Sequence, residues 1–218
     1  MFLVVTATPQ EMAPIARRLA AFPGWLPLVT GVGCLETAIG LTRFLSQEQR
    51  PITAIINCGV AGAFVGAGPG LLDLCLADHE SLADAGIATA DGIVEFDTIT
   101  LPSRFPLHGP LLDQARTILT KQGLSFWVGP MVSVLAVSGT QARGEGLRAR
   151  FSALCENMEG AAVARVAAEF HLPCLELRTI SNMVEERDLT RWQLAQAIAR
   201  LAEAMALLLP GLRELAHA

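Results

Sequence analysis

Residues 157–164 read Asn-Met-Glu-Gly-Ala-Ala-Val-Ala, and about twenty residues later the chain reads Ile180-Ser181-Asn182. In the first stretch, a Met-Glu pair leads into small residues that predict a helix over 160–170. In the second, an apolar run that predicts a buried strand over 175–180 ends in a polar Ser-Asn step. The ends of two buried elements therefore present a carboxylate and an amide.

The same alternation of strand and helix extends over the chain. Apolar runs predict strands at 2–6, 26–30, 53–57, 71–77, 125–137, 151–156 and 175–180, with a further one at 93–96. Helices are predicted from Thr8-Pro9, which supplies a cap and a tolerated first-turn proline, and at 35–45, 111–121, 160–170 and 189–209. Residues 79–108 predict a long excursion. This order predicts an α/β fold with a largely parallel sheet, helices on both faces, and a single domain over 1–218.

Composition and charge exclude several classes of protein. Of the 218 residues, 52% are hydrophobic and 17% are charged, which is typical of a globular protein. The net charge of −5 and the lack of a basic stripe argue against a nucleic-acid surface. Neither the five cysteines nor the four histidines form a spaced ligand set, so we expect free thiols and no metal site. We expect neither a secretory leader nor a membrane span, and a cytoplasmic protein is the default interpretation.

Polar residues follow several of the predicted strands. In open α/β sheets, ligands bind beyond the carboxyl ends of the strands. The loops that this rule selects are 6–11, 30–33, 57–62, 137–140, 157–159 and 181–188. Most polar residues that adjoin apolar runs fall in these loops, so we expect the loops to surround one pocket.

Each candidate in that pocket has a structural interpretation beside a functional one. Glu11 and Glu159 each open a helix, where an acid stabilises the helix dipole by about 0.3–1 kcal/mol. Alternatively, the two carboxylates flank a sugar, one activating water and the other accepting hydrogen bonds from hydroxyl groups. Met158 either fills the core or packs against the sugar face. Asn182 is either a turn residue or an amide that hydrogen-bonds the edge of a purine.

Other catalytic and cofactor-binding motifs are missing from the sequence. Glu36 stands where a dinucleotide-binding G-x-G-x-x-G motif starting at Gly31 needs its third glycine, and the glycines at 66–70 precede no good helix. There is no Walker A sequence, and no serine lies in a G-x-S-x-G elbow. Dinucleotide enzymes, P-loop enzymes and serine hydrolases are therefore disfavoured.

Several segments together resemble the purine nucleoside phosphorylase and nucleosidase superfamily. Residues 157–164 resemble its E-M-E-x-x-A segment, 178–182 its R-x-I-S-D segment, 57–62 its N-T-G-x-A-G loop, and 30–33 its S-G-I-G loop. Glu11 falls where the nucleosidase branch has its water-activating glutamate. The resemblance implies a three-layer α/β/α sandwich with a mixed, partly barrel-like central sheet. It also implies a homodimer with each active site near the subunit interface.

Within that superfamily, the chain is similar to the futalosine hydrolase branch. Residues 180–188 and Trp192 resemble its I-S-N-x-V-G-x-R-D…W pattern, and 137–140 its V-S-G-T segment, although Glu185 replaces a frequent glycine. The resemblance implies cleavage of futalosine to hypoxanthine and dehypoxanthine futalosine in menaquinone biosynthesis, without a cofactor. It implies that Glu11 and Asn182 are catalytic. The implied substrate-binding residues are Gly62, Val137, Asn157, Met158, Glu159 and Ser181.

Two positions carry the chemistry that we expect. Adenine-cleaving nucleosidases have Asp where the chain has Asn182, and an amide can donate to the 6-oxygen of hypoxanthine, which a carboxylate would repel. Residues 7–11 lack the Arg of the phosphorylases' G-D-P-x-R loop, so we expect water as the acceptor. The carboxylate of the futalosine tail is expected to meet a cation or a backbone donor. The candidates by loop position are Arg104, His108, Arg143 and Arg187, and the alternative for each is a solvated surface residue.

Two other functions stay open on the sequence alone. A 5′-methylthioadenosine/S-adenosylhomocysteine nucleosidase performs the same chemistry on an adenine nucleoside, and Asn182 with Arg187-Asp188 argues against it. A non-catalytic nucleoside-binding protein of the same fold would not need Glu11 to face the anomeric carbon.

Overall fold

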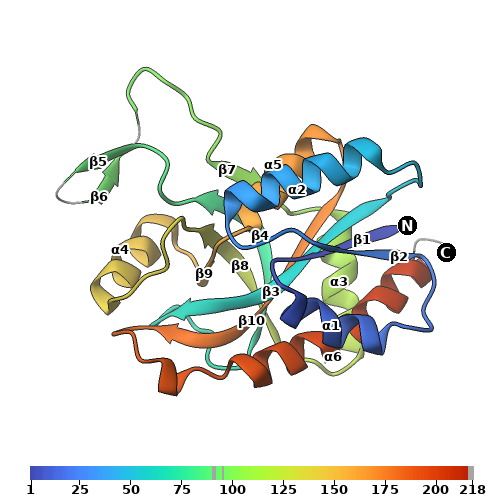
Figure 1. Cartoon of the computed structure of the whole chain (residues 1–218). Helices are drawn as coiled ribbons and strands as arrows, with labels where there is room; N and C mark the ends of the chain where they lie inside the picture. Colours follow the sequence, from blue (N-terminus) through green and yellow to red (C-terminus); the bar gives the residue numbers. More distant parts are fainter. Residues whose placement is uncertain (90–91, 95, 216–218) are drawn as a thin grey trace.

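The computed structural model describes residues 1–89, 92–94 and 96–215 (Figure 1). Its strands are β1 (Phe2–Thr6), β2 (Trp25–Val29), β3 (Ala54–Phe64), β4 (Leu74–Leu82), β5 (Ile87–Thr89), β6 (Gly92–Val94), β7 (Arg104–Pro106), β8 (Phe126–Ser133), β9 (Cys155–Asn157) and β10 (Cys174–Val184). Its helices are α1 (Pro9–Arg18), α2 (Cys34–Gln47), α3 (Pro110–Lys121), α4 (Gln141–Phe151), α5 (Gly160–Glu169), the short 3-10 helix η1 (Leu189–Arg191) and α6 (Leu194–Leu215).

The main sheet is mixed and partly closes into a barrel. Strands β3, β10, β4, β8 and β9 pair in a ring, because β3 contacts both β10 and β9. Strands β1 and β2 extend the sheet from β3, and β7 pairs with β4. The pairings β1–β2, β1–β3, β3–β10, β4–β8 and β8–β9 are parallel, whereas β4–β10, β3–β9 and β4–β7 are antiparallel. The predicted fold class, with its largely parallel sheet, is confirmed.

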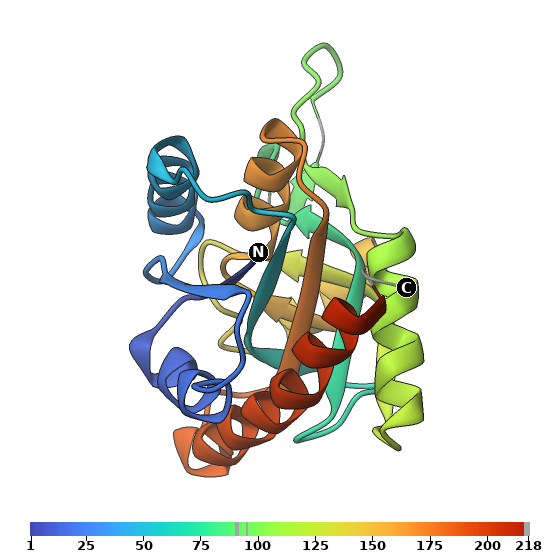
Figure 2. The same ribbon diagram turned by 90° about the vertical axis from the view of Figure 1, so that its right-hand side faces the viewer.

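Helices cover both faces of this sheet, as the sandwich architecture requires (Figure 1). On one face, α6 packs between α1 and α3 and against β3 and β10 (Figure 2). Leu201 and Met205 of α6 are fully buried there, in the same core cluster as Ile56 and Leu177. On the other face, α5 packs against α2 and against β4 and β8. The two helical layers hold the strands in place from both sides.

The C-terminal helix is a core element. The helical stretch Leu189–Glu214 is long and apolar enough to cross a membrane by length and composition alone. In the structure, however, Ala197, Leu201, Met205 and Leu208 are buried against the sheet and the neighbouring helices. The predicted helix over 189–209 is therefore a short 3-10 turn followed by α6, which continues through Pro210 to Leu215.

Several segments differ from the sequence-based expectation, among them α4, where no helix was predicted. The predicted loop at 58–62 belongs to β3, because its small residues are buried and pair with β10. The predicted strand at 151–156 is the end of α4, a turn and β9. Gly144 brings α4 close to β10, since a Cβ there would lie 2.5 Å from Val184. The strand expected at 93–96 is represented by β6, and residue 95 lies outside the described residues.

Candidate active site

Strand β10 carries two charged side chains into the protein interior. Glu176 and Arg178 are two residues apart and therefore share a face of the strand. Arg178 is 1% exposed and donates to Glu176 Oε1 at 2.8 Å and to Asn157 Oδ1 at 3.2 Å. Its Nη1 lies 3.5 Å from both the Val60 carbonyl oxygen and Glu159 Oε2. Burial alone would lower the pKa of Arg178, but the carboxylates of Glu176 and Glu159 outweigh burial and raise that pKa, so the residue stays a cation.

The turn from β9 into α5 presents Glu159. Asn157 shapes this turn, because its Oδ1 accepts from the N–H groups of Glu159 at 2.9 Å and of Gly160 at 2.7 Å. Its Nδ2 donates to Glu80. Asn157 therefore positions Glu159, and its direct contact with a substrate stays a prediction. Glu159 Oε1 accepts from the backbone N–H of Gly33 at 2.9 Å, at the N-terminus of α2.

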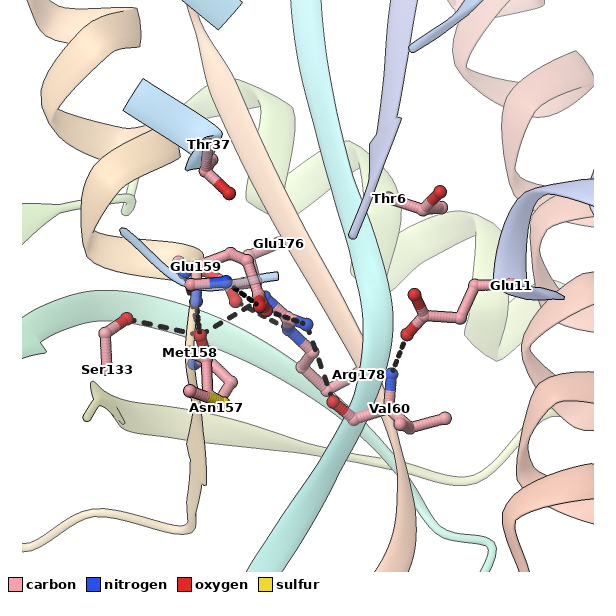
Figure 3. Close-up of polar contacts among 12 residues, drawn as sticks. Thr6, Glu11, Thr37, Val60, Ser133, Asn157, Met158, Glu159, Glu176 and Arg178 are labelled. Atoms are coloured by element: carbon pink, nitrogen blue, oxygen red, sulfur yellow. Dashed lines mark hydrogen bonds and ion pairs between the residues drawn. The ribbon is translucent and has the colours of Figure 1, made fainter. Parts of the chain in front are cut away.

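Glu11 reaches the same region from the first turn of α1. Its Oε2 accepts from Thr8 N at 3.0 Å and from Thr8 Oγ1 at 2.8 Å. Glu11 N in turn donates to Thr8 Oγ1 at 3.3 Å, and the two backbone contacts form a capping box. Its Oε1 accepts from Val60 N at 3.1 Å. A Cβ on Gly59 would lie 2.6 Å from Arg178 Nη1 and 2.8 Å from Glu11 Oε1, so this glycine admits both side chains. Figure 3 shows Glu11 and Glu159 on opposite sides of Val60, with Arg178 between Val60 and Glu159.

Asn182, Ser181 and Gly62 meet farther along the same two strands. Gly62 and Asn182 are register partners across β3 and β10, next to a bulge at Ser181. A Cβ on Gly62 would lie 3.0 Å from Asn182 Nδ2, so the glycine lets the amide lie against β3. Ser181 Oγ lies 2.9 Å from Asn182 Oδ1 and 3.3 Å from the Ala61 carbonyl. Asn182 Nδ2 donates to the Met183 carbonyl at 3.3 Å, and its second N–H has no acceptor among the residues that the structure describes.

A cavity of about 40 Å³ adjoins Asn182. Ser138 lines it and is held by Glu156, which accepts from Ser138 N at 2.8 Å and from Ser138 Oγ at 2.6 Å. The preceding residue, Val137, is 42% exposed. Met158 is half-buried against the cluster of residues around Phe64. Substrate contacts by Val137 and Met158 stay predictions.

The four predicted tail-binding cations are dispersed. Arg187 lines the small cavity beside Asn182. Arg143 forms an ion pair with Asp84 at 3.2 Å, and Arg104 lies on β7. His108 lines a different cavity, of about 740 Å³, at the amino ends of β1, β3 and β10. That larger cavity contains none of the predicted catalytic or substrate-binding residues, so its size does not identify the active site.

A layer of polar residues beneath Glu159 was missed from the sequence. Glu80 and Glu176 are buried carboxyl groups on β4 and β10. Ser133 Oγ accepts from Ala161 N at 2.7 Å and donates either to Glu80 Oε2 at 3.0 Å or to Asn157 Oδ1 at 3.2 Å. The sequence signal for these residues is an acidic residue within an apolar run, such as Glu176 between two leucines, because acidic residues are seldom buried without a partner.

Among the described residues, no group of three His, Cys, Asp or Glu side chains is arranged to hold a metal ion.

The chain belongs to the Phosphorylase superfamily, whose family model matches residues 2–212. A futalosine hydrolase from Streptomyces coelicolor is 34% identical over 237 aligned residues, which cover 96% of this chain and 95% of that relative. This similarity makes the chain a member of the futalosine hydrolase family, a group of N-glycosidic hydrolases.

Two further comparisons are consistent with that membership. A 5′-methylthioadenosine/S-adenosylhomocysteine nucleosidase from Staphylococcus aureus is 27% identical, over 71% of this chain and 66% of its own length. The solved structure of a futalosine hydrolase mutant from Helicobacter pylori is 20% identical and covers 98% of each chain with a TM-score of 0.84. At that identity, the structural match shows the shared fold.

Proposed function

We propose that the chain hydrolyses the N-glycosidic bond of futalosine, releasing hypoxanthine and dehypoxanthine futalosine for menaquinone biosynthesis. The observation that carries this proposal is the arrangement along β3. Glu11 and Arg178 both bond the Val60 backbone, and Asn182 lies against Gly62, two residues farther along the strand. Two residues of strand span about 6.6 Å. The Glu11 carboxylate and the Asn182 amide are therefore separated along β3 by a distance similar to that between the ribose of a nucleoside and the far edge of its base.

The acidic group suits the sugar half of the reaction. Cleavage of the C–N bond leaves positive charge on the ribose and negative charge on the base. Glu11 accepts a proton from water while the water oxygen bonds to the anomeric carbon, and the electron pair of the C–N bond leaves with the base. Glu159 accepts hydrogen bonds from the ribose hydroxyls and stabilises the cationic sugar. Because Gly33 and Arg178 already hold the Glu159 carboxylate, it needs little reorganisation.

Asn182 suits a 6-oxopurine. The free N–H of its amide can donate to the 6-oxygen of hypoxanthine or to the neighbouring ring nitrogen, which stabilises the departing base before solvent protonates it. An ionised Asp would present an oxygen to the 6-oxygen and leave a buried polar contact unmade. Such a loss costs about 1–3 kcal/mol, which corresponds to roughly tenfold to a hundredfold in preference.

The charges at the site favour water over phosphate as the acceptor. Glu11 and Glu159 are both buried beside the expected sugar position. The buried cation, Arg178, is already bonded to Glu176 and Glu159. A phosphate dianion would meet two carboxylates and no unpaired cation among the described residues of this group, and like charges repel strongly at low dielectric.

The proposal includes a homodimer in the cytoplasm. Val32, Leu35 and Ile39 at the start of α2 are 54%, 76% and 60% exposed, an apolar surface suited to a subunit contact. Gly33 lies within this surface and bonds Glu159, so a partner subunit there would border the ribose site.

Arg187, beside Asn182, is the cation that we assign to the carboxylate of the substrate tail.

A panel of four nucleosides tests the proposal. Futalosine, aminodeoxyfutalosine, 5′-methylthioadenosine and inosine are each supplied to the purified chain, and kcat/KM is measured from the released base. We expect futalosine to give the highest value. A higher value for 5′-methylthioadenosine would reject the assigned substrate, and no release from any of the four would reject the enzyme assignment.

A further inference from the structure

Two buried carboxyl groups converge beneath Gly160. Glu80 on β4 is fully buried, and Glu176 on β10 is 1% exposed. A Cβ on Gly160 would lie 2.6 Å from both carboxyl oxygens of Glu176 and closer still to Glu80 Oε1. The two carboxyl groups therefore point at the same position, and they have room there only because Gly160 has no side chain.

The hydrogen bonds around these carboxyl groups lack one donor. Glu176 Oε1 accepts from Arg178 Nε at 2.8 Å, whereas Glu176 Oε2 is buried with no donor among the described residues. Glu80 accepts from Asn157 Nδ2 and from Ser133 Oγ, and its Oε1 meets the Glu176 oxygens at the position that a Cβ of Gly160 would occupy. A proton on Glu80 would supply the missing donor to Glu176. Two ionised carboxylates would instead leave that oxygen unsatisfied and repel each other.

The balance of buried charge also favours a proton on one of the two carboxyl groups. Four buried carboxyl groups, on Glu11, Glu80, Glu159 and Glu176, lie around Arg178, the one buried cation among the described residues. Burial and then the neighbouring Glu176 raise the pKa of Glu80 well above its ordinary value. Burial also raises the pKa of Glu176. Arg178 opposes the rise at both groups, but its Nε bonds Glu176 Oε1 directly, at 2.8 Å. Glu176 is therefore the partner that ionises more readily, and Glu80 is the one that keeps a proton.

We propose that Glu80 and Glu176 share one proton, held mainly on Glu80, and that this pair positions the ribose-binding Glu159. The pair bonds two of the three groups that hold Glu159, namely Asn157 and Arg178 but not Gly33. Glu80 bonds Asn157, which accepts from the Glu159 N–H, and Glu176 bonds Arg178, which pairs with the Glu159 carboxylate. The positioning role rests on the proposed function, whereas the shared proton does not.

The other titratable groups around the pair are one guanidinium, one carboxyl group and several thiols. Arg178 of β10 remains a cation, as described above, and Glu159 faces the pair from the start of α5. Burial raises the pKa of the thiols of Cys34 on α2, Cys58 on β3 and Cys174 on β10. A hydrogen bond with Cys75 of β4, followed by burial, raises the pKa of Cys155 on β9. The thiols of Cys34, Cys58, Cys155 and Cys174 therefore remain neutral and do not compete for the proton.

The substitution Glu80→Gln tests the shared proton, because the amide keeps the shape and the donor of a neutral acid but cannot titrate. Urea unfolding is followed at fixed protein concentration from about pH 6 to about pH 8. Above the ordinary carboxyl pKa of 4.5, the folded chain binds a proton that the unfolded chain has released. The unfolding equilibrium constant of the unsubstituted chain should therefore rise about tenfold more per pH unit than that of Glu80→Gln.

The exposed Glu169 supplies a matched control. Glu169→Gln makes the same Glu-to-Gln change in a solvent-exposed ion pair and should keep the pH slope of the unsubstituted chain. Equal slopes for Glu80→Gln and the unsubstituted chain would overturn the shared proton. The same proton should give the infrared C=O stretch of a neutral carboxylic acid at neutral pH, and Ser133→Ala should shift this band because Ser133 bonds Glu80. Absence of the band would also overturn the proposal, even if Glu80→Gln does not fold.

Kinetics with futalosine test the positioning role. Glu80→Gln should keep a higher kcat/KM than Glu80→Ala, because the amide keeps the side-chain volume and an oxygen that can accept from Asn157 Nδ2. Glu80→Ala should raise KM by about tenfold or more with a smaller change in kcat, since it loosens the turn that holds Glu159. An unchanged KM in a folded Glu80→Ala variant would overturn that role. Failure of the unsubstituted chain to cleave futalosine would reject the proposed function and leave the proton measurements intact.

Discussion

Glu11 has both a structural and a proposed chemical role, and the substitution Glu11→Gln separates them. Its carboxylate accepts three hydrogen bonds, from Thr8 N, Thr8 Oγ1 and Val60 N, at 3.0, 2.8 and 3.1 Å. A carboxamide has one oxygen and one NH2 group, so at least one of these donors loses its acceptor. The substitution therefore weakens the capping box and removes the proposed base in one step.

The two roles predict effects of very different size. One buried donor without an acceptor costs about 1–3 kcal/mol of the free energy of unfolding. In a chain of this size, each kcal/mol lowers Tm by about 2–4 °C, so most molecules stay folded at assay temperature. Loss of a general base lowers kcat by about 10²-fold to 10⁴-fold. Activity should thus fall far more than stability accounts for.

Thr8→Ala is the matched control. It removes the Thr8 hydroxyl, which bonds Glu11 N at 3.3 Å and Glu11 Oε2 at 2.8 Å, but keeps the Glu11 carboxylate. Losing such a cap costs about 0.5–2 kcal/mol. We expect similar losses of Tm for the two variants and a fall in kcat below tenfold for Thr8→Ala. The reasoning is refuted if Glu11→Gln keeps more than about a tenth of kcat, or if the two variants lose kcat equally.

Three further predictions concern the base, the ribose and a thiol. Asn182→Asp should shift the ratio of kcat/KM from futalosine toward aminodeoxyfutalosine by roughly tenfold to a hundredfold, and equal losses on both substrates would contradict the role of the amide. Glu159→Gln should lower kcat/KM by about 10²-fold to 10³-fold, measured with futalosine, while circular dichroism stays unchanged. Burial, aided by the Glu159 charge, raises the pKa of the Cys34 thiol to about 11, so the neutral thiol persists below that pH. At pH 8, mass spectrometry should find Cys34 alkylated by iodoacetamide about a hundredfold more slowly than free cysteine, and an equal rate would contradict this burial.

Much of the fold is predictable because local signals and tertiary packing agree. β1 begins and ends where its apolar run does, and Thr8 caps α1 as expected. β3 was predicted to end at Asn57, yet the strand runs to Phe64. Its glycines and alanines look like a loop in the sequence, but they allow Asn182 and Arg178 to approach the backbone. α4 was missed because it contains Gly144 and Gly146 and buries little apolar surface.

The candidate site was predictable in part. The structure brings Glu11 and Glu159 to the two sides of Val60 and sets Asn182 against Gly62. Sequence reasoning placed ligand contacts in loops beyond the strands, whereas Arg178 lies within β10. The contribution of Glu80 depends on the pairing of β4 with strands distant in sequence, and no local pattern gives that register. The roles of the individual site residues stay proposals until they are substituted.

The central claim is that this chain transfers the ribosyl group of futalosine to water. The most direct measurement is the initial rate of hypoxanthine release from futalosine, followed by chromatography, in phosphate-free buffer and again with added phosphate. We predict the same rate in both buffers, with dehypoxanthine futalosine as the second product. Release that requires phosphate and yields a sugar phosphate, or no release in either buffer, would contradict the claim.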